Sequence, residues 1–159
     1  MTFICTLDPN DDLDIDVIES NEEYVVRLAI GFDSESQKTY SLAVALSPLP
    51  GGSMELTFSV LIFCQNSGEW HDIWDGLATS AIFSSKDERN LIRAALMACV
   101  TLLIDHVRPH TVNFVTHTAA LPNKALVKFF EVQQIFIDKG YAGGRADSYH
   151  GRYVWIMTR

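Results

Sequence analysis

The chain has 159 residues, of which 48% are hydrophobic and 20% charged, as in a typical soluble globular domain. Its net charge of −8 disfavours direct binding to a nucleic-acid phosphate backbone, which would repel it. The cysteines Cys5, Cys64 and Cys99 show no C-x-x-C spacing, which favours reduced thiols over a disulfide framework. Because acidic residues occupy the place of an apolar signal segment, we expect a cytoplasmic protein.

The acidic residues are concentrated in the first half of the chain. Residues 1–85 contain fourteen acids and two bases, a net of −12, whereas residues 86–159 contain ten bases and six acids, a net of +4. We expect one domain, with an acidic strand meander over residues 1–83 and a helix-strand-helix-strand half over residues 84–159. This asymmetry favours a basic protein partner, or pairing between the acidic half of one copy and the basic half of another.

The first elements in chain order are a strand over residues 2–7 and an acidic segment. In that segment Asp12, Asp14 and Asp16 alternate with apolar residues, which predicts a short edge strand with its charges outward. A calcium loop is the alternative use of these carboxylates. It lacks the glycine at the sixth position and the glutamate at the twelfth that such a loop needs.

Three longer segments alternate apolar and polar residues and predict an antiparallel meander. They cover residues 24–32, 40–46 and 54–62, with turns at 33–36 and 48–52. Residues 70–74 and 78–83 are expected to add strands. The first of these carries Trp70 and Trp74, which would suit a protein-interaction patch if exposed, because tryptophan is enriched at interface hot spots.

A long helix should follow the meander. Ser85 and Glu88 have the S-x-x-E spacing of a capping box, and the apolar run from Leu91 to Val107 continues the helix until Pro109. Because polar and charged residues interrupt this run, it predicts a core helix covered on more than one side, and no membrane span.

The rest of the chain predicts a strand, a helix and a last strand. The strand covers Thr111–Thr116, and Pro122 fits the first turn of an amphipathic helix that ends before Gly140. After a glycine-rich loop, Arg152–Met157 alternates as a strand. The fold class is therefore α+β: a largely antiparallel sheet with two helices packed on it, in the order β-β-β-β-α-β-α-β.

Two groups of residues are candidate binding sites. In the loop from Gly140 to Arg152, glycines allow close backbone approach and arginines can bind carboxylate or phosphate through paired hydrogen bonds. The alternative is a connection whose arginines offset the acidic half. The loop candidates are Gly143, Gly144, Arg145, Tyr149, His150 and Arg152; the candidate interaction patch comprises Asp12, Asp14, Asp16, Trp70 and Trp74.

The end of the second predicted helix carries a short motif. Residues 136–141, Phe-Ile-Asp-Lys-Gly-Tyr, have the spacing of a Y-x-x-x-G-F-like signature, and a strand over residues 153–157 follows. With the order meander, long helix, strand, second helix and last strand, this half of the chain resembles the GNAT-type N-acyltransferases. The resemblance implies an acyl-CoA cofactor and an N-acyltransferase activity.

Two departures from the GNAT pattern argue against that chemistry. The family binds the coenzyme pyrophosphate on a Q/R-x-x-G-x-G/A loop at the start of the long helix. The matching residues 83–88 contain no glycine, and Asp87 and Glu88 would repel phosphate. The tyrosine that often serves those enzymes as general acid is replaced by Phe136, which has no proton to give.

No complete catalytic or metal constellation is present in the sequence. His106 and His110 are separated by Pro109, so they do not share a helical face, and no G-x-S-x-G, Walker A or G-x-G-x-x-G pattern occurs. We therefore expect a non-catalytic protein that presents an acidic surface to a basic partner, such as a nucleic-acid-binding protein, with inhibition as the specific form. The alternatives are a small-molecule enzyme with an unusual phosphate-binding loop around Gly143–Arg145, and a homo-oligomeric structural protein.

Overall fold

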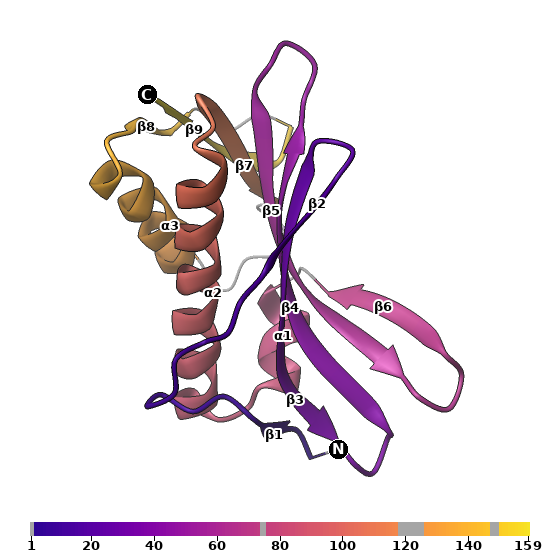
Figure 1. The fold of residues 1–159 in the computed structure, drawn as a ribbon. Helices are drawn as coiled ribbons and strands as arrows, with labels where there is room; N and C mark the ends of the chain where they lie inside the picture. Colours follow the sequence, from indigo (N-terminus) through magenta and orange to yellow (C-terminus); the bar gives the residue numbers. More distant parts are fainter. Residues whose placement is uncertain (1, 74–75, 118–125, 147–149) are drawn as a thin grey trace.

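The computed structural model describes residues 2–73, 76–117, 126–146 and 150–159 (Figure 1). Three residues of the predictions, Trp74, Pro122 and Tyr149, lie outside these ranges. The strands are β1 Ile4–Cys5, β2 Val17–Ser20, β3 Glu23–Asp33, β4 Lys38–Pro48, β5 Met54–Cys64, β6 Glu69–Ile73, β7 Thr111–His117, β8 Ala142–Arg145 and β9 Arg152–Thr158; the helices are α1 Gly76–Ile82, α2 Lys86–Val107 and α3 Leu126–Asp138. The fold is thus α+β, as the order of the patterns predicts.

The strands form one mixed, mostly antiparallel sheet. Its order is β1-β3-β4-β5-β7-β9-β8, with β2 pairing β3 and β6 pairing β5. Among the described residues the pair β5–β7 alone is parallel, and its register covers Met54–Val112 and Glu55–Asn113. The same edge of β5 pairs with β6 at the other end of the strand. Because β6 and β7 share one edge of β5, the sheet divides there into two branches.

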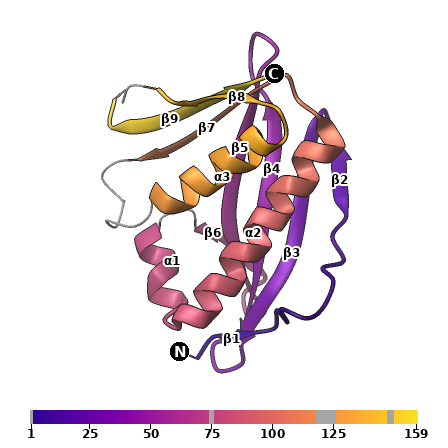
Figure 2. The same cartoon turned by 90° about the vertical axis from the view of Figure 1, so that its left-hand side faces the viewer.

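Helices α2 and α3 lie side by side on one face of this sheet (Figures 1 and 2). Helix α2 contacts β3 and β4, and α3 contacts β8 and β9. Although α2 is long and apolar enough to cross a membrane by length and composition, seven of its residues are buried in this structure. It begins as predicted at Ser85, whose hydroxyl accepts the Glu88 amide at 3.4 Å, and ends at Arg108 in the left-handed conformation.

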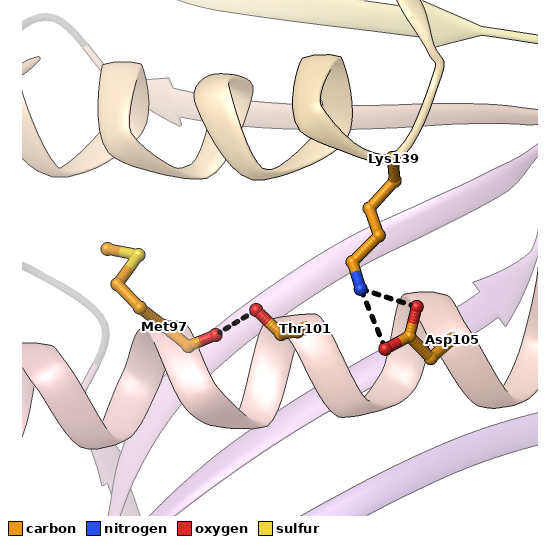
Figure 3. A network of polar contacts seen from close by, with 4 residues as sticks. All are labelled: Met97, Thr101, Asp105 and Lys139. Atoms are coloured by element: carbon orange, nitrogen blue, oxygen red, sulfur yellow. Dashed lines mark hydrogen bonds and ion pairs between the residues drawn. The ribbon is translucent and has the colours of Figure 1, made fainter.

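A polar contact joins the two helices at their C-terminal ends. Lys139, directly after α3, places its Nζ 2.6 and 2.7 Å from the two carboxylate oxygens of Asp105 on α2 (Figure 3). One turn earlier the Thr101 hydroxyl donates to the Met97 carbonyl. The ion pair links the C-terminal ends of the two helices, whereas the Thr101 hydrogen bond lies within α2; apolar side chains fill the space between the helices and the sheet.

The core lies between the helices and one face of the sheet. At its centre Trp155 is fully buried and stacks on Phe114 and Phe129, with ring centroids 5.4 and 5.0 Å apart. Alternate residues of each strand face this core, because successive side chains of a strand point to opposite faces. The buried residues include Val26, Ile30, Tyr40, Leu42, Val44, Leu46, Leu56, Val60, Ile62, Val112 and Met157.

Three of the local predictions were wrong. Residues 78–83 were expected to form a strand, but 76–82 form α1, because periodicity does not separate a short apolar run in a strand from one in a helix. Residues 12–16 form no strand, since the pairing with β3 begins at Val17. The glycine-rich loop contains β8, which pairs with β9.

Candidate protein-interaction surfaces

The acidic edge, defined as residues 8–23, runs through the loop after β1, through β2 and through the turn into β3. Within it, β2 pairs with the outer edge of β3, as Figure 2 shows. All eight of its carboxylates are exposed: Asp8, Asp11, Asp12, Asp14, Asp16, Glu19, Glu22 and Glu23. Among the described residues no lysine or arginine forms an ion pair with any of them. Their negative charge is therefore directed at the solvent.

The acidic edge also carries exposed apolar side chains. Leu13 is 36% and Ile18 55% exposed. These carboxylates affect a neighbouring titratable group: the negative charge of Glu19 raises the pKa of the Tyr24 hydroxyl. A segment that combines exposed carboxylates with exposed leucine and isoleucine can bind both the charges and the apolar parts of a basic protein surface.

Trp70, the described tryptophan of the predicted patch, lies elsewhere. It is 53% exposed on β6, with its ring centroid 4.7 Å from that of Phe63 and 4.7 Å from the Arg27 guanidinium carbon. Strands β3, β4 and β5 separate β6 from β2. The structure therefore brings Asp12, Asp14 and Asp16 together on the acidic edge and places Trp70 apart from them.

The loop candidates within the described ranges lie on β8, on β9 and in the turn directly before β9. Gly143 has φ +137°, and a Cβ atom there would lie 2.0 Å from the Ile156 carbonyl oxygen, so this glycine permits close pairing of β8 with β9. The Arg145 guanidinium carbon lies 4.7 Å from the Tyr153 ring centroid. Gly144 lies on β8, next to Gly143, and Arg152 is the first residue of β9. His150 lies in the turn before β9 and has a backbone φ of 48°.

The start of α2 carries negative charge. Asp87 and Glu88 occupy its first turn and repel anions. The nearby Arg89 guanidinium donates hydrogen bonds to the backbone carbonyl oxygens of Phe83 and Ser84 at 2.9 and 2.8 Å. This cation is therefore engaged in contacts within the chain. Within the described ranges there is also no group of three or more His, Cys, Asp and Glu residues that could hold a metal ion.

The face of the sheet opposite α2 and α3 was not singled out from the sequence. We call it the helix-free face, and define it by the β3–β6 residues that point away from the core. They include Val25, Arg27, Ala29, Phe32, Ser41, Ala43, Ala45, Thr57, Ser59, Leu61, Phe63, Trp70 and Asp72. The signal that could have found it is the second row of each alternating strand, which is rich in alanine, serine and threonine.

A hollow of about 490 Å³ adjoins the helix-free face near the β3–β4 turn. Its lining includes Ala29, Phe32, Thr39 and Ser41. Asp33 also lines the hollow, and this residue is 1% exposed. The Asp33 Oδ1 accepts hydrogen bonds from the backbone amides of the turn that joins the two strands, which gives this carboxylate a structural role.

Comparisons with protein-family models, with curated proteins and with solved structures found no match.

Proposed function

We propose that this chain is a non-catalytic binding protein whose acidic edge docks on a basic protein surface. The observation that carries the proposal is the row of eight exposed carboxylates over residues 8–23, none of which is paired with a lysine or arginine in the described part of the chain. Uncompensated surface charge of one sign accelerates association with the opposite sign and selects the partner.

The partner class follows from the chemistry of the edge. Lysine and arginine side chains satisfy the carboxylates, and their aliphatic stems can pack on Leu13 and Ile18. Nucleic-acid-binding proteins present such surfaces, because they must neutralise phosphates. Occupation of that surface by the acidic edge would inhibit nucleic-acid binding, which is the specific form of the proposal.

The acyltransferase alternative receives no support from the start of α2. A coenzyme pyrophosphate needs free backbone amides and compatible charge, whereas this turn holds Asp87, Glu88 and an arginine engaged with the chain. An acyl-CoA is therefore the natural negative control in a binding experiment. A rise in the melting temperature with acyl-CoA would revive the alternative.

The test is the binding of a fluorescent lysine-rich peptide, followed by anisotropy. We expect the variant Asp11→Asn, Asp12→Asn, Asp14→Asn, Asp16→Asn to bind at least about tenfold more weakly, equivalent to about 1.4 kcal/mol. All four side chains are exposed, so the fold should survive, as circular dichroism can verify.

A matched control separates the acidic edge from the net charge. The variant Glu35→Gln, Glu69→Gln, Asp72→Asn, Asp138→Asn removes the same amount of charge from exposed positions elsewhere. It should retain affinity within about threefold, since screening limits the reach of exposed charges to roughly 10 Å. Equal losses in both variants would contradict a localised binding site.

A further inference from the structure

The side chain of Lys128, on α3, ends among aromatic rings. Its Nζ lies 5.1 Å from the ring centroid of Phe58 on β5 and 5.2 Å from that of Phe129. In the part of the chain that the structure describes, this amine forms no ion pair. An amine in such surroundings loses hydration and gains only the weaker attraction of the ring faces.

The carboxylate best placed to pair with Lys128 is engaged elsewhere. Residues three apart in a helix are neighbours, so Glu131 is within reach of Lys128. The Glu131 Oε2 instead lies 3.6 Å from the Nε of Arg93 on α2. The first turn of α3 also holds no acidic residue, and the positive end of a helix dipole disfavours a cation there. These surroundings favour the neutral form of the Lys128 amine.

The protonation of Lys128 reflects this environment. Desolvation lowers the pKa of the Lys128 amine. A neutral amine has a free electron pair, and a desolvated lysine is the usual nucleophile for Schiff-base formation with carbonyl compounds. The Lys128 side chain is still partly exposed, so a small molecule can reach it from the solvent.

The rings beside Lys128 belong to an aromatic cluster, which we define as Phe58, Phe129, Phe130 and Trp155. The ring centroids of Phe58 and Phe129 are 5.5 Å apart, and the Trp155 ring stacks on Phe129 at 5.0 Å. Phe130 contacts Trp155 at 6.1 Å and is 47% exposed, so the cluster extends from the core to the surface. Aromatic side chains of this kind pack well on the ring of a ligand.

We propose that Lys128 is a covalent binding site for aromatic aldehydes, whose carbonyl carbon is attacked by the amine and whose ring packs on the aromatic cluster. The Nζ atom forms a bond to the carbonyl carbon and gives a carbinolamine. Loss of water, which takes up the carbonyl oxygen and the two amine hydrogens, leaves a Schiff base. The step needs no oxidant or reductant, and the site shares no residue with the acidic edge.

Reductive trapping with benzaldehyde tests the site. The folded protein is incubated at neutral pH with benzaldehyde and cyanoborohydride, which reduces the Schiff base to a stable secondary amine, and mass spectrometry of peptides identifies the modified lysines. We expect Lys128 to react at least about tenfold faster than the exposed Lys86, and unfolding in urea to abolish the difference. Equal rates at the two lysines of the folded protein would overturn the proposal.

Arg93→Gln tests the cause of the reactivity without removing the amine. Once released from Arg93, Glu131 can pair with Lys128 and stabilise its ammonium form, so modification of Lys128 should slow about threefold. Arg152→Gln is the matched control, because it removes the same charge from an exposed position on β9 and should leave the rate unchanged. A rate that Arg93→Gln leaves unaltered, or that both variants lower equally, would refute this explanation.

Glyceraldehyde tests the role of the aromatic cluster. It carries the same reactive group without a ring, so its preference for Lys128 over Lys86 should be smaller than that of benzaldehyde. An equal preference would refute the binding of the ligand ring by the cluster. Lys128→Met removes the amine and should leave binding of the lysine-rich peptide unchanged, so failure of this site and failure of the acidic edge are distinguishable.

Discussion

The two faces of the sheet are built from the same strands and the same backbone hydrogen bonds, yet they differ in side-chain size. Along β4, Leu42, Val44 and Leu46 face α2 and are buried, whereas Ala43 and Ala45 between them face away and are partly exposed. The first row stabilises the fold by removing apolar area from water. The second contributes less to that core and is available for binding.

The largest expected difference between the faces concerns two tryptophans. Trp155→Ala should lower the free energy of unfolding by about 3–5 kcal/mol, because it removes a buried ring stacked between Phe114 and Phe129. Trp70→Ala should cost less than about 1 kcal/mol, chiefly the contact with Arg27. Urea denaturation measures both. Similar losses would show that the helix-free face is part of the monomer core.

Thiol reactivity gives a second comparison. Burial against the sheet raises the pKa of the Cys99 thiol to about 11, while Cys5 and Cys64 are partly exposed. Since the thiolate is the reactive form, Cys99 should react with a thiol reagent at pH 8 about a hundredfold more slowly than an ordinary cysteine. Mass spectrometry of the labelled protein over time identifies each site. Early labelling of Cys99 in the folded protein would contradict its placement in the core.

A pair of valines tests the two faces with one small change. Val44→Thr places a hydroxyl in the buried row and should cost about 1–3 kcal/mol. Val25→Thr, on the neighbouring strand and the opposite face, should change stability by less than about 0.5 kcal/mol. Thermal unfolding at low protein concentration compares the variants as monomers. A larger loss from Val25→Thr than from Val44→Thr would reverse the assignment of the faces.

The smallest expected effect is at the surface of the helical layer. Asp105→Asn removes the ion pair with Lys139, which is partly exposed and therefore stabilises by about 0.2–1 kcal/mol. The loss should shrink at high salt, because salt screens exposed charges. Denaturation at low and high ionic strength measures it. A decrease in the free energy of unfolding of more than about 2 kcal/mol would mean that the packing of α2 against α3 depends on this ion pair.

Much of the fold could be predicted from local patterns. Period-two alternation located β3, β4 and β5, and the Ser85 cap located the start of α2, because both signals act within a few residues. What could not be predicted depends on distant pairing. The parallel pairing of β5 with β7 joins segments about a third of the chain apart, and neither segment's pattern reveals it or shows that β6 pairs with the same edge of β5.

The candidate sites follow the same division. Exposure of the carboxylates over residues 8–23 was predictable from composition, since so many unpaired charges cannot be buried. The distance between that edge and Trp70 depends on strand order, which the pattern did not reveal. The structural role of Gly143 required the register of β8 on β9, and the helix-free face required knowing which side α2 and α3 cover.

Carboxyl footprinting tests the central claim most directly. The protein is labelled with a carbodiimide and an amine, with and without the lysine-rich peptide, and the sites are read by mass spectrometry. The account predicts that the peptide protects the carboxylates of residues 8–23, that it leaves Asp87 and Glu88 labelled, and that high salt abolishes the protection. Protection centred on α2, or none on the acidic edge at a peptide concentration that saturates binding, would contradict it.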